Sequence, residues 1–487
     1  MLRETRRCTA RLAGVLRGAA ANDIIHYMGE NTAPPTVLLI SYHFHPASEV
    51  GGRRTTALAQ YLASKGLRVV VVSTFGGAAI EVGSEVLPGI IAVPIAQPRK
   101  VFIQAVLSLK PRSQPERDVS PESASPPGLR ALLLKLRGRV RETFFQIVYF
   151  VDEHKKWGWL ASRAAILAGR KYQARLLISS SPPFTALLTG RWAAWRLDVP
   201  HLADLRDPWT DSMAGKRPLQ RLERWLLRIL ERWALGSAAA ITLTGATLAE
   251  LLSTRYHAAR DRIHVVRNGF EGEVPRGPDA TGERLAMLFA GELYVGRDPF
   301  PLLEALERLL ARPDVDPARV SVIFMGSAAR YKGVSLAEWM AGKRCASVVK
   351  ILPPSTPHAV AAAVAEATVL LNLAQEQPLS VPAKTYEHLA SGREILLICE
   401  GDSETALLVA GMTGVNQVDQ RDPLALEQVL LDLYRRHAVQ GRMTPPIEAE
   451  VRRFSRAAAN ERFWPIINSV ANVSDHDQAD VEASSSP

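Results

Sequence analysis

The stretch TVLLISYHFHPASEVGGRRTTALAQYLASKGLRVVVVST at residues 36–74 decides the fold. It begins with a short continuous apolar run at residues 37–41, which is typical of a strand covered on both faces of a sheet. A helix is expected at residues 53–65, ended by Gly66, and a second apolar strand follows at residues 68–74. Strand, helix and strand in this order predict a parallel sheet with ligand sites at the carboxyl ends of its strands.

The same alternation continues along the chain in two series. The first is expected to add strands at residues 90–94, 175–179, 201–204, 239–243 and 263–266. The second is expected to have strands at residues 285–290, 320–325, 348–352, 369–373, 395–398 and 414–418. A stretch rich in glycine and proline at residues 272–282 separates them and is expected to be a linker. The pattern predicts an α/β protein with two Rossmann-like domains facing each other across a cleft.

Domain boundaries are expected from these patterns and from local composition. They are a poorly ordered basic extension at 1–35, an N-terminal Rossmann-like domain at 36–272 with a mobile loop at 110–128, a C-terminal Rossmann-like domain at 283–445, a helical segment at 446–470 and a disordered tail at 471–487. Met28 is an alternative start of the chain.

Composition narrows the class of protein. The chain has 487 residues, of which 47% are apolar and 22% charged, and this is an ordinary globular composition with room for two domains. Its cysteines, Cys8, Cys345 and Cys399, lie too far apart for a disulfide framework or a metal-ligand spacing. No stretch reaches the ~18 apolar residues that a membrane span needs. These features predict a cytoplasmic protein.

Positive charge is concentrated in a few segments. The formal net charge is +10, and residues 1–17, 129–141 and 216–232 hold more than this excess between them. Within 217–233 the apolar residues fall on one helical face and the arginines on the opposite face, and 129–145 repeats the theme. Short basic amphipathic pieces favour an anionic membrane surface at the inner face of the cell membrane, with no nucleic acid as partner. The alternative is a helix that packs on its own sheet and leaves its arginines in solvent.

Two motifs of the first domain place polar groups at strand ends. Gly51 and Gly52 open the helix after the first strand, where glycine allows close approach of a ligand and the helix start favours negative charge. The arginines that follow, Arg53 and Arg54, are candidates for contact with a phosphate group of a substrate. The alternative is a solvent-facing turn with surface arginines.

The sharpest local signal is HLADLRDPW at residues 201–209. Asp204, Arg206 and Asp207 come just after a strand, so they are expected to face the cleft. A carboxylate there would orient or deprotonate an acceptor hydroxyl, and Arg206 would pair with Asp207 or meet a phosphate. The alternative is an Arg–Asp pair that shapes the loop.

Several motifs together carry a family resemblance. They are SYHFHPASEVGGRR (41–54), VDEHKKWGWL (151–160), LISSSPPFTALL (177–188), HLADLRDPW (201–209), VVRNGFE (265–271), LFAGELYVGRDP (288–299) and VPAKTYEHLASG (381–392). In this order and spacing the chain resembles retaining glycosyltransferases of the two-Rossmann-domain (GT-B) type in the family-four group. It is most similar to members that act in surface-polysaccharide assembly, and the resemblance covers residues 37–470.

The resemblance implies a donor site between the domains. In the family, the loop equivalent to Gly51 and Gly52 lies near the donor phosphates and the acceptor, and the turn at Asn268 abuts the donor cleft. Family members carry an arginine and a lysine that neutralise the donor diphosphate. Arg297 matches the arginine, the usual downstream lysine is missing, and Lys384 is a plausible replacement.

The second C-terminal motif is expected to bind the nucleotide. A helix begins near Val381 and Pro382, and its backbone N–H groups are expected to face the diphosphate. Glu387 matches the family carboxylate that binds the donor ribose. The family's commoner form has a second glutamate eight residues earlier, where this chain has Leu379. No Asp-x-Asp motif occurs at an expected cleft-facing strand end, so metal-independent transfer is predicted.

The predicted reaction is transfer of a sugar from a UDP- or GDP-linked donor to a hydroxyl of a saccharide or lipid-linked acceptor, with no further cofactor. The resemblance implies retention at the anomeric carbon. One alternative is a nucleotide-sugar epimerase of the same fold. Another is an inactive protein that binds a membrane surface or nucleic acid, which the missing glutamate at Leu379 favours.

Overall fold

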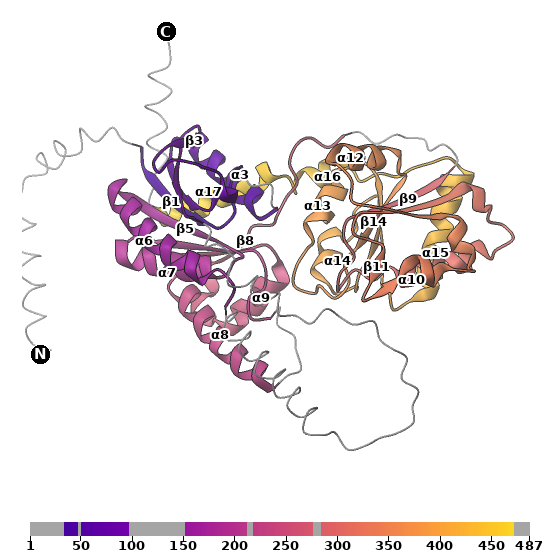
Figure 1. Cartoon of the computed structure of the whole chain (residues 1–487), viewed down its shortest axis with the longest axis horizontal. Helices are drawn as coiled ribbons and strands as arrows, with labels where there is room; N and C mark the ends of the chain where they lie inside the picture. Colours follow the sequence, from indigo (N-terminus) through magenta and orange to yellow (C-terminus); the bar gives the residue numbers. More distant parts are fainter. Residues whose placement is uncertain (1–33, 47–49, 97–150, 212–217, 276–283, 472–487) are drawn as a thin grey trace, which may run out of the picture.

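The computed structural model describes residues 34–46, 50–96, 151–211, 218–275 and 284–471. The expectations for the basic extension up to residue 33, the loop at 110–128, the basic stretch at 129–145 and the tail from residue 472 lie outside the described residues. Figure 1 shows two sheet-containing domains side by side, with the N-terminal half of the chain in one and most of the C-terminal half in the other.

The N-terminal domain is built on an eight-stranded sheet in the order β3-β4-β2-β1-β5-β6-β7-β8. Its strands are β1 (Thr36–Ser41), β2 (Arg68–Ser73), β3 (Glu85–Leu87), β4 (Ile90–Pro94), β5 (Ala174–Ser181), β6 (His201–Leu205), β7 (Ala240–Leu243) and β8 (Ile263–Val265). All neighbours are parallel except β3, which pairs antiparallel with β4. The strand β1 is buried along its whole length, as expected for the centre of a sheet that is covered on both faces.

Helices cover both faces of this sheet. They are α3 (Val50–Ser64), α6 (Lys155–Lys171), α7 (Thr185–Leu197), α8 (Pro218–Gly236) and α9 (Ala246–Arg255). Because side chains alternate along a strand, Leu39 packs with Leu58 and Leu62 of α3, whereas its neighbour Leu38 packs in the core with Trp157 of α6 and Ala193 of α7. Figure 1 shows α6 and α7 together on one side of the sheet.

The C-terminal domain is a six-stranded parallel sheet in the order β13-β10-β9-β14-β15-β16. Its strands are β9 (Leu285–Ala290), β10 (Val320–Met325), β13 (Val349–Leu352), β14 (Val369–Leu373), β15 (Glu394–Ile398) and β16 (Val415–Val418). This order is that of a dinucleotide-binding fold, in which ligands bind beyond the carboxyl ends of the strands where the order reverses. The reversal here lies between β9 and β14.

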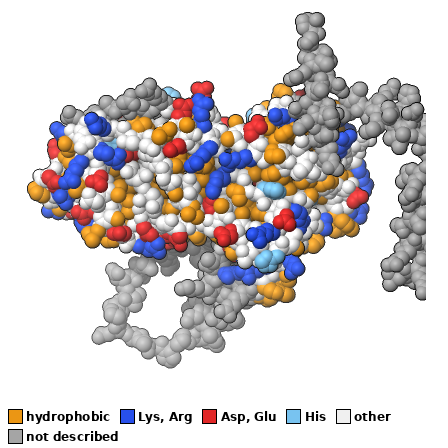
Figure 2. All heavy atoms as spheres, turned by 180° about the vertical axis from the view of Figure 1, so that it is seen from behind, with side chains coloured by type: hydrophobic (Ala, Val, Ile, Leu, Met, Phe, Trp, Pro, Cys, Tyr) orange, Lys and Arg blue, Asp and Glu red, His pale blue; other side chains and the backbone are white. Residues whose placement is uncertain are grey.

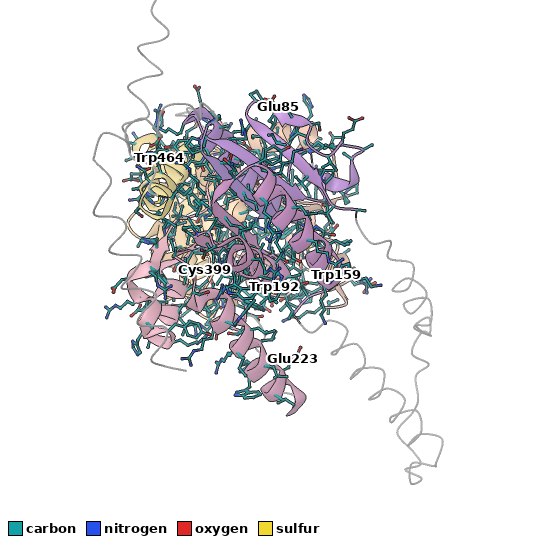
Figure 3. The ribbon with its side chains drawn as sticks, turned by 90° about the vertical axis from the view of Figure 1, so that its left-hand side faces the viewer. Glu85, Trp159, Trp192, Glu223, Cys399 and Trp464 are labelled. Carbon is teal, nitrogen blue, oxygen red and sulfur yellow. The ribbon has the colours of Figure 1, made fainter. Side chains whose placement is uncertain are left out.

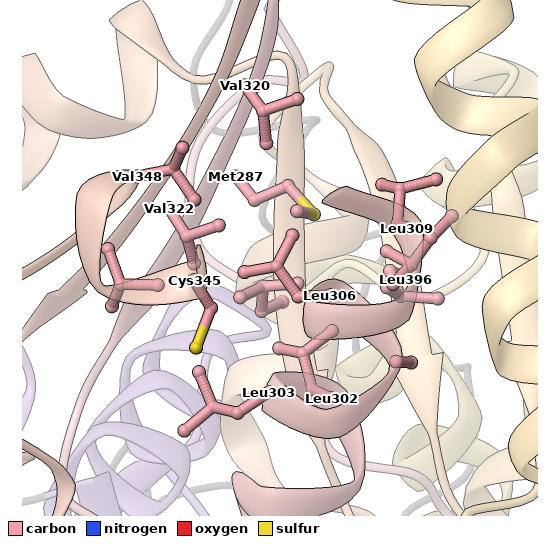
Figure 4. Packing of buried hydrophobic residues seen from close by; sticks show 14 of the residues in the cluster. Met287, Leu302, Leu303, Leu306, Leu309, Val320, Val322, Cys345, Val348 and Leu396 are labelled. Atoms are coloured by element: carbon pink, nitrogen blue, oxygen red, sulfur yellow. The ribbon is translucent and has the colours of Figure 1, made fainter. Parts of the chain in front are cut away.

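The C-terminal helices again cover both faces. They are α10 (Phe300–Leu310), α11 (Leu336–Met340), α12 (Pro357–Glu366), α13 (Ala383–Leu389), α14 (Glu404–Val409) and α15 (Pro423–Tyr434), and a small hairpin joins β11 (Arg330–Tyr331) to β12 (Val334–Ser335). Leu302 and Leu306 of α10 pack on Met287 and Val322 of the sheet, and Figure 4 shows this layer. Figure 1 places α13 and α14 at the side that faces the N-terminal domain.

The end of the chain returns to the N-terminal domain. After α16 (Glu448–Arg452), helix α17 (Arg456–Ala471) packs beside α3. The Asn460 side chain donates to the carbonyl of Ala57 at 3.1 Å, and Phe463 is buried in the N-terminal core. The chain therefore crosses between the two domains twice.

The predicted fold class is confirmed: the protein is α/β with a parallel sheet in each of two domains. Every strand that the apolar runs predict is present, with bounds within two residues. The edge strand β3 and the β11–β12 hairpin were not predicted, because runs of two or three residues carry no periodic signal. Among the described helices, none combines the length and apolar character needed to cross a membrane.

Candidate functional site

An ion pair joins the start of helix α3 in the N-terminal domain to helix α13 in the C-terminal domain. Nη1 of Arg53, in the first turn of α3, lies 3.5 Å from Oε1 of Glu387 in α13, and the two side chains are 46% and 45% exposed. Lys384 Nζ lies 3.7 Å from the other oxygen of Glu387. Figure 2 shows Lys and Arg side chains gathered near the boundary between the two domains. A ligand that enters between the domains can reach all three charges.

Two cations of the C-terminal domain converge on the glycine after β9. A Cβ atom built on Gly291 would lie 3.3 Å from Cε of Lys384 and 3.5 Å from Nη1 of Arg297. Arg297 is held in place by the carbonyl of Glu292 at 3.2 Å and by the ring of Tyr294, whose centroid lies 4.3 Å from its guanidinium carbon. The structure thus brings Arg297 and Lys384 together over backbone that a ligand can approach closely.

The remaining residues expected at the nucleotide site lie where α13 begins. Pro382 is buried and its carbonyl accepts from the N–H of Thr385, while Val381 is half-buried before it. Sequence reasoning missed His388, which is buried in the same helix. Burial and the charges of Lys384 and Arg297 lower the pKa of His388 to about 3, so this side chain is neutral at physiological pH. Burial is the main cause of this low pKa, and the two nearby cations add to it.

A buried ion pair joins α3 to the strand ends of the N-terminal sheet. Arg54 donates to both carboxylate oxygens of Asp204, at 3.2 Å and 3.0 Å, and the two side chains are 6% and 1% exposed. Ser180 Oγ and Thr242 Oγ1 also donate to Asp204, at 2.7 Å and 2.8 Å. Burial alone would raise the pKa of Asp204, but the charge and hydrogen bonds of Arg54 hold it below its usual value.

Arg54 also reaches the hinge between the domains. Its guanidinium donates to the carbonyls of Val266 and Arg267 and to Oδ1 of Asn268, all between 2.9 and 3.2 Å. Asn268 is half-buried. It is held by Arg54, the same arginine that pairs with Asp204. This network fixes the start of α3 to the end of the N-terminal sheet.

Arg206 fastens the first glycine loop. Its guanidinium donates to the carbonyls of Ser181, Gly51 and Pro182 at 2.6, 2.7 and 2.8 Å. A Cβ atom on Gly51 would lie 3.1 and 3.2 Å from its two terminal nitrogens, which is closer than ordinary contact. Gly52 is buried behind it. A side chain at position 51 would therefore push the Arg206 guanidinium away by a few tenths of an ångström.

Asp207 differs from the other two charged residues of its motif. Its side chain reaches solvent, although protein surrounds much of it. The surrounding protein raises the pKa of the Asp207 carboxyl, Arg206 opposes this, and the charge of Asp204 adds to it. Asp204 and Arg206 are buried, so Asp207 is the charged residue of this motif that a ligand can reach.

A second interdomain contact was not predicted from the sequence. Glu404, at the start of α14, accepts from the backbone N–H groups of Ala246 and Thr247 at 2.9 and 2.7 Å and from Arg267 at 2.6 Å. Its side chain is fully buried. A carboxylate of the C-terminal domain therefore occupies the N-terminus of helix α9 in the other domain, where the helix favours negative charge. It lies beside Leu379, because both approach Gly245.

Among the described residues, no group of three or more His, Cys, Asp or Glu side chains is arranged to hold a metal ion. The Asp-x-Asp sequence at residues 314–316 lies at the surface, where the carboxylate of Asp314 pairs with Arg312 at 3.1 Å.

Comparisons with known proteins agree with this architecture. Residues 51–269 match the family model described as a glycosyl transferase 4-like domain. The fold is similar to that of a glycosyltransferase from Rickettsia africae, at 11% identity and a TM-score of 0.52, over 91% of this chain and all of that one.

Two further solved structures share the fold. An α,α-trehalose 6-phosphate synthase from Burkholderia multivorans has 13% identity and a TM-score of 0.55, over 91% of this chain and 98% of that one. Anabaena HepE, solved in complex with UDP-glucose, has 12% identity and a TM-score of 0.50, over 90% and 98%. The comparison with curated proteins found no significant match.

Proposed function

Because its glycosyl transferase 4-like domain and its GT-B fold indicate a glycosyltransferase, we propose that this protein transfers a sugar from a UDP- or GDP-linked donor to an acceptor hydroxyl. The observation that carries the proposal is the convergence of Arg53, Glu387, Lys384 and Arg297 from two domains at the carboxyl ends of both sheets. One carboxylate among three cations suits a ligand with ribose hydroxyls and a diphosphate.

The donor diphosphate is assigned to Arg297 and Lys384. The bond between the anomeric carbon and the diphosphate oxygen breaks, and negative charge develops on the departing nucleoside diphosphate. Two cations beside Gly291 oppose that charge in the role that a divalent ion has elsewhere. The start of α13 near Val381 and Pro382 adds backbone N–H groups on the same side. We therefore propose transfer without a metal ion.

Glu387 is assigned to the donor ribose. Without ligand its carboxylate contacts Arg53 and Lys384. Ribose hydroxyls donate to the carboxylate when the donor binds, which frees Lys384 to turn toward the diphosphate. HepE, which shares the fold, was solved with UDP-glucose, and this supports a nucleotide-sugar as the ligand.

On the acceptor side, Asp207 is assigned as the group that meets the hydroxyl. Its carboxylate is accessible and its raised pKa makes it a better proton acceptor than an ordinary aspartate. The acceptor oxygen bonds to the anomeric carbon and its proton passes to Asp207. Arg54, which pairs with Asp204, holds Asn268, and Arg206 holds Gly51. Retention at the anomeric carbon is part of the proposal and rests on the family resemblance.

We propose that the acceptor is a saccharide or a lipid-linked saccharide in polysaccharide or glycolipid assembly, at an anionic membrane surface. Exposed tryptophans on basic helices of the N-terminal domain, among them Trp159 and Trp225, support the membrane part.

The test combines donor binding with turnover. Nucleotide-sugars are screened by thermal shift, since a ligand that binds the native state stabilises it, and the best donor is used to measure release of UDP or GDP. We expect Glu387→Ala to weaken donor binding and Arg297→Ala chiefly to lower kcat, by about a hundredfold or more. The surface variant Arg312→Ala is the matched control. Unchanged kinetics in both site variants, or conversion of the donor to an isomer without release of nucleotide, would contradict the proposal.

A further inference from the structure

One side of the N-terminal domain exposes an unusual number of tryptophans. The chain has nine, and in its described part the exposed ones are Trp159 of α6, Trp192 and Trp195 of α7, and Trp225 and Trp233 of α8. The three helices are neighbours, since α7 contacts both α6 and α8. We call the surface of α6, α7 and α8 the tryptophan face. Figure 3 looks onto it, with Trp159, Trp192 and Glu223 spread across the view.

Helix α8 turns its apolar side outward. Five of its large apolar side chains are between 37% and 58% exposed, namely Leu222, Trp225, Leu226, Ile229 and Trp233. Its contact with the domain is made instead by Leu227, Ala234 and Leu235, which are buried. An amphipathic helix on a soluble domain normally buries its apolar stripe. The alternative stated from the sequence, that this stripe packs on the helix's own sheet, is not what the structure has.

The tryptophan face is also strongly basic. Helices α6, α7 and α8 contain eleven Lys and Arg residues and two acidic residues, a net charge of +9 in a chain of net charge +10. One of the two acids, Glu231, is buried against Tyr256 and Arg255. The three helices that expose these five tryptophans thus carry a large net positive charge.

Arginines lie directly over several of these rings. The guanidinium of Arg163 is 3.9 Å from the ring centroid of Trp159, that of Arg191 is 5.5 Å from Trp233 and that of Arg196 is 5.9 Å from Trp195. Tryptophan prefers the boundary between hydrocarbon and water, and arginine pairs with phosphate groups. Each of these pairs can therefore sit at a lipid headgroup, with the ring below and the cation beside the phosphate.

We infer that the tryptophan face docks on the surface of an anionic lipid bilayer. A second copy of the chain fits it poorly, because two faces of net charge +9 repel each other. A nucleic acid would match the charge and leave the outward stripe of α8 in water. A bilayer with acidic headgroups matches both the apolar and the basic part.

One end of the tryptophan face lies next to the carboxyl end of β1. The ring of His154, which precedes α6, lies 4.1 Å from that of Tyr42, directly after β1. Docking would thus bring the amino end of α6, which contacts the residue after β1, to the membrane surface, where a lipid-linked acceptor is found. The link to a lipid-linked acceptor rests on the proposed function. Docking on the bilayer does not, because it requires no turnover.

The experiment is sedimentation of the full chain with vesicles of phosphatidylcholine, with and without phosphatidylglycerol, at low and high salt. We expect binding that needs phosphatidylglycerol and weakens with salt. Trp225→Ala with Ile229→Ala should lower binding by about tenfold or more, because two large apolar contacts are lost. Arg228→Glu with Arg232→Glu should lower it further, by about a hundredfold. The control is Leu407→Ala with Leu424→Ala, two exposed leucines of the C-terminal domain.

Each outcome decides the question. Loss of binding in both α8 variants, with the control unchanged, supports docking through this face. Failure of the wild-type chain to bind, binding that ignores phosphatidylglycerol, or equal binding by the α8 variants overturns it. So does a wild-type dimer that the α8 variants dissociate, because the face is then an interface between copies. Release of nucleotide from a soluble donor is measured in parallel, so a failure of the catalytic proposal appears separately.

Discussion

Removing the carboxylate of Asp204 should unfold the N-terminal domain more easily without removing a reacting group. In Asp204→Ala, Arg54 keeps its contacts to the hinge carbonyls but loses its only buried counter-charge among the described residues. Ser180 and Thr242 also lose their acceptor. Breaking one side of a buried ion pair costs about 3–5 kcal/mol, chiefly because the other charge stays buried and uncompensated.

The expected shift in melting temperature follows from that free energy. In a domain of roughly 200 residues, each kcal/mol changes the melting temperature by about 2–4 °C. Asp204→Ala should therefore melt roughly 6–20 °C below the wild type in scanning calorimetry of the full chain. The double variant Arg54→Met with Asp204→Leu should be less destabilised than the sum of the two single variants, since it leaves no orphaned charge.

Kinetics of Asp204→Asn separate a structural role from a catalytic one. This variant keeps the shape and removes the charge, and it should also lose stability. Transfer activity per folded molecule should fall only modestly at a temperature where the variant is folded. A variant that melts within about 2 °C of the wild type while losing transfer by about a hundredfold or more would refute the reasoning and make Asp204 a catalytic base.

Three further outcomes are expected. Gly51→Ala should slow transfer by about tenfold or more, because the new Cβ displaces the loop from Arg206, while Gly401→Ala, with open space around it, should leave the rate unchanged. Glu404→Gln should loosen the contact with α9, by about 1.5–3 kcal/mol, visible as a larger radius of gyration in X-ray scattering; an unchanged radius and melting temperature would contradict the assigned contact. The transfer rate should rise with pH through a pKa above that of an ordinary aspartate, because the pKa of Asp207 is raised and its ionised form takes the proton; the same profile in Asp207→Asn would exclude this assignment.

The stability contributed by Asp204 should have its own pH dependence. Its pKa is lowered in the folded state from an ordinary value of 3.8. The stabilisation is therefore fully present above that value and is lost as pH falls through the folded pKa. Unfolding midpoints measured between pH 7 and pH 5 should show no loss from this group, and acid lability should begin below about pH 4.

The sequence predicted the sheets well because buried parallel strands are continuous apolar runs. The run VVVVS in β2 and the run LAMLFA of β9 can hardly be anything else in a chain that also shows helical spacing between them. The packing of α17 on α3 could not be predicted from the sequence in the same way. An apolar helical face at residues 456–471 indicates that it is covered, but not which of two domains covers it.

Part of the candidate site could be predicted from the sequence. Arg297 and Lys384 were named as a pair from the sequence, and the structure places both at Gly291. Glu404 carried no signal, since a glutamate just after Ser403 is an ordinary first-turn residue of a capped helix. Its partners Ala246 and Thr247 lie more than 150 positions earlier in the chain, and only the approach of the two domains brings them together.

The adjacent residues Arg53 and Arg54 show why local pattern cannot assign such roles. Both were treated alike from the sequence, but successive residues of a helix point about 100° apart. Arg53 therefore faces the other domain and meets Glu387, whereas Arg54 turns inward to Asp204. The first turn of α3 thus carries two charges with different roles. Arg53 contacts Glu387, which is assigned to the donor ribose, and Arg54 forms the buried ion pair that fixes the helix. It follows that a change at Asp204 reaches Arg53 only through the position of the helix, so in folded Asp204 variants donor affinity should fall only modestly although stability falls strongly.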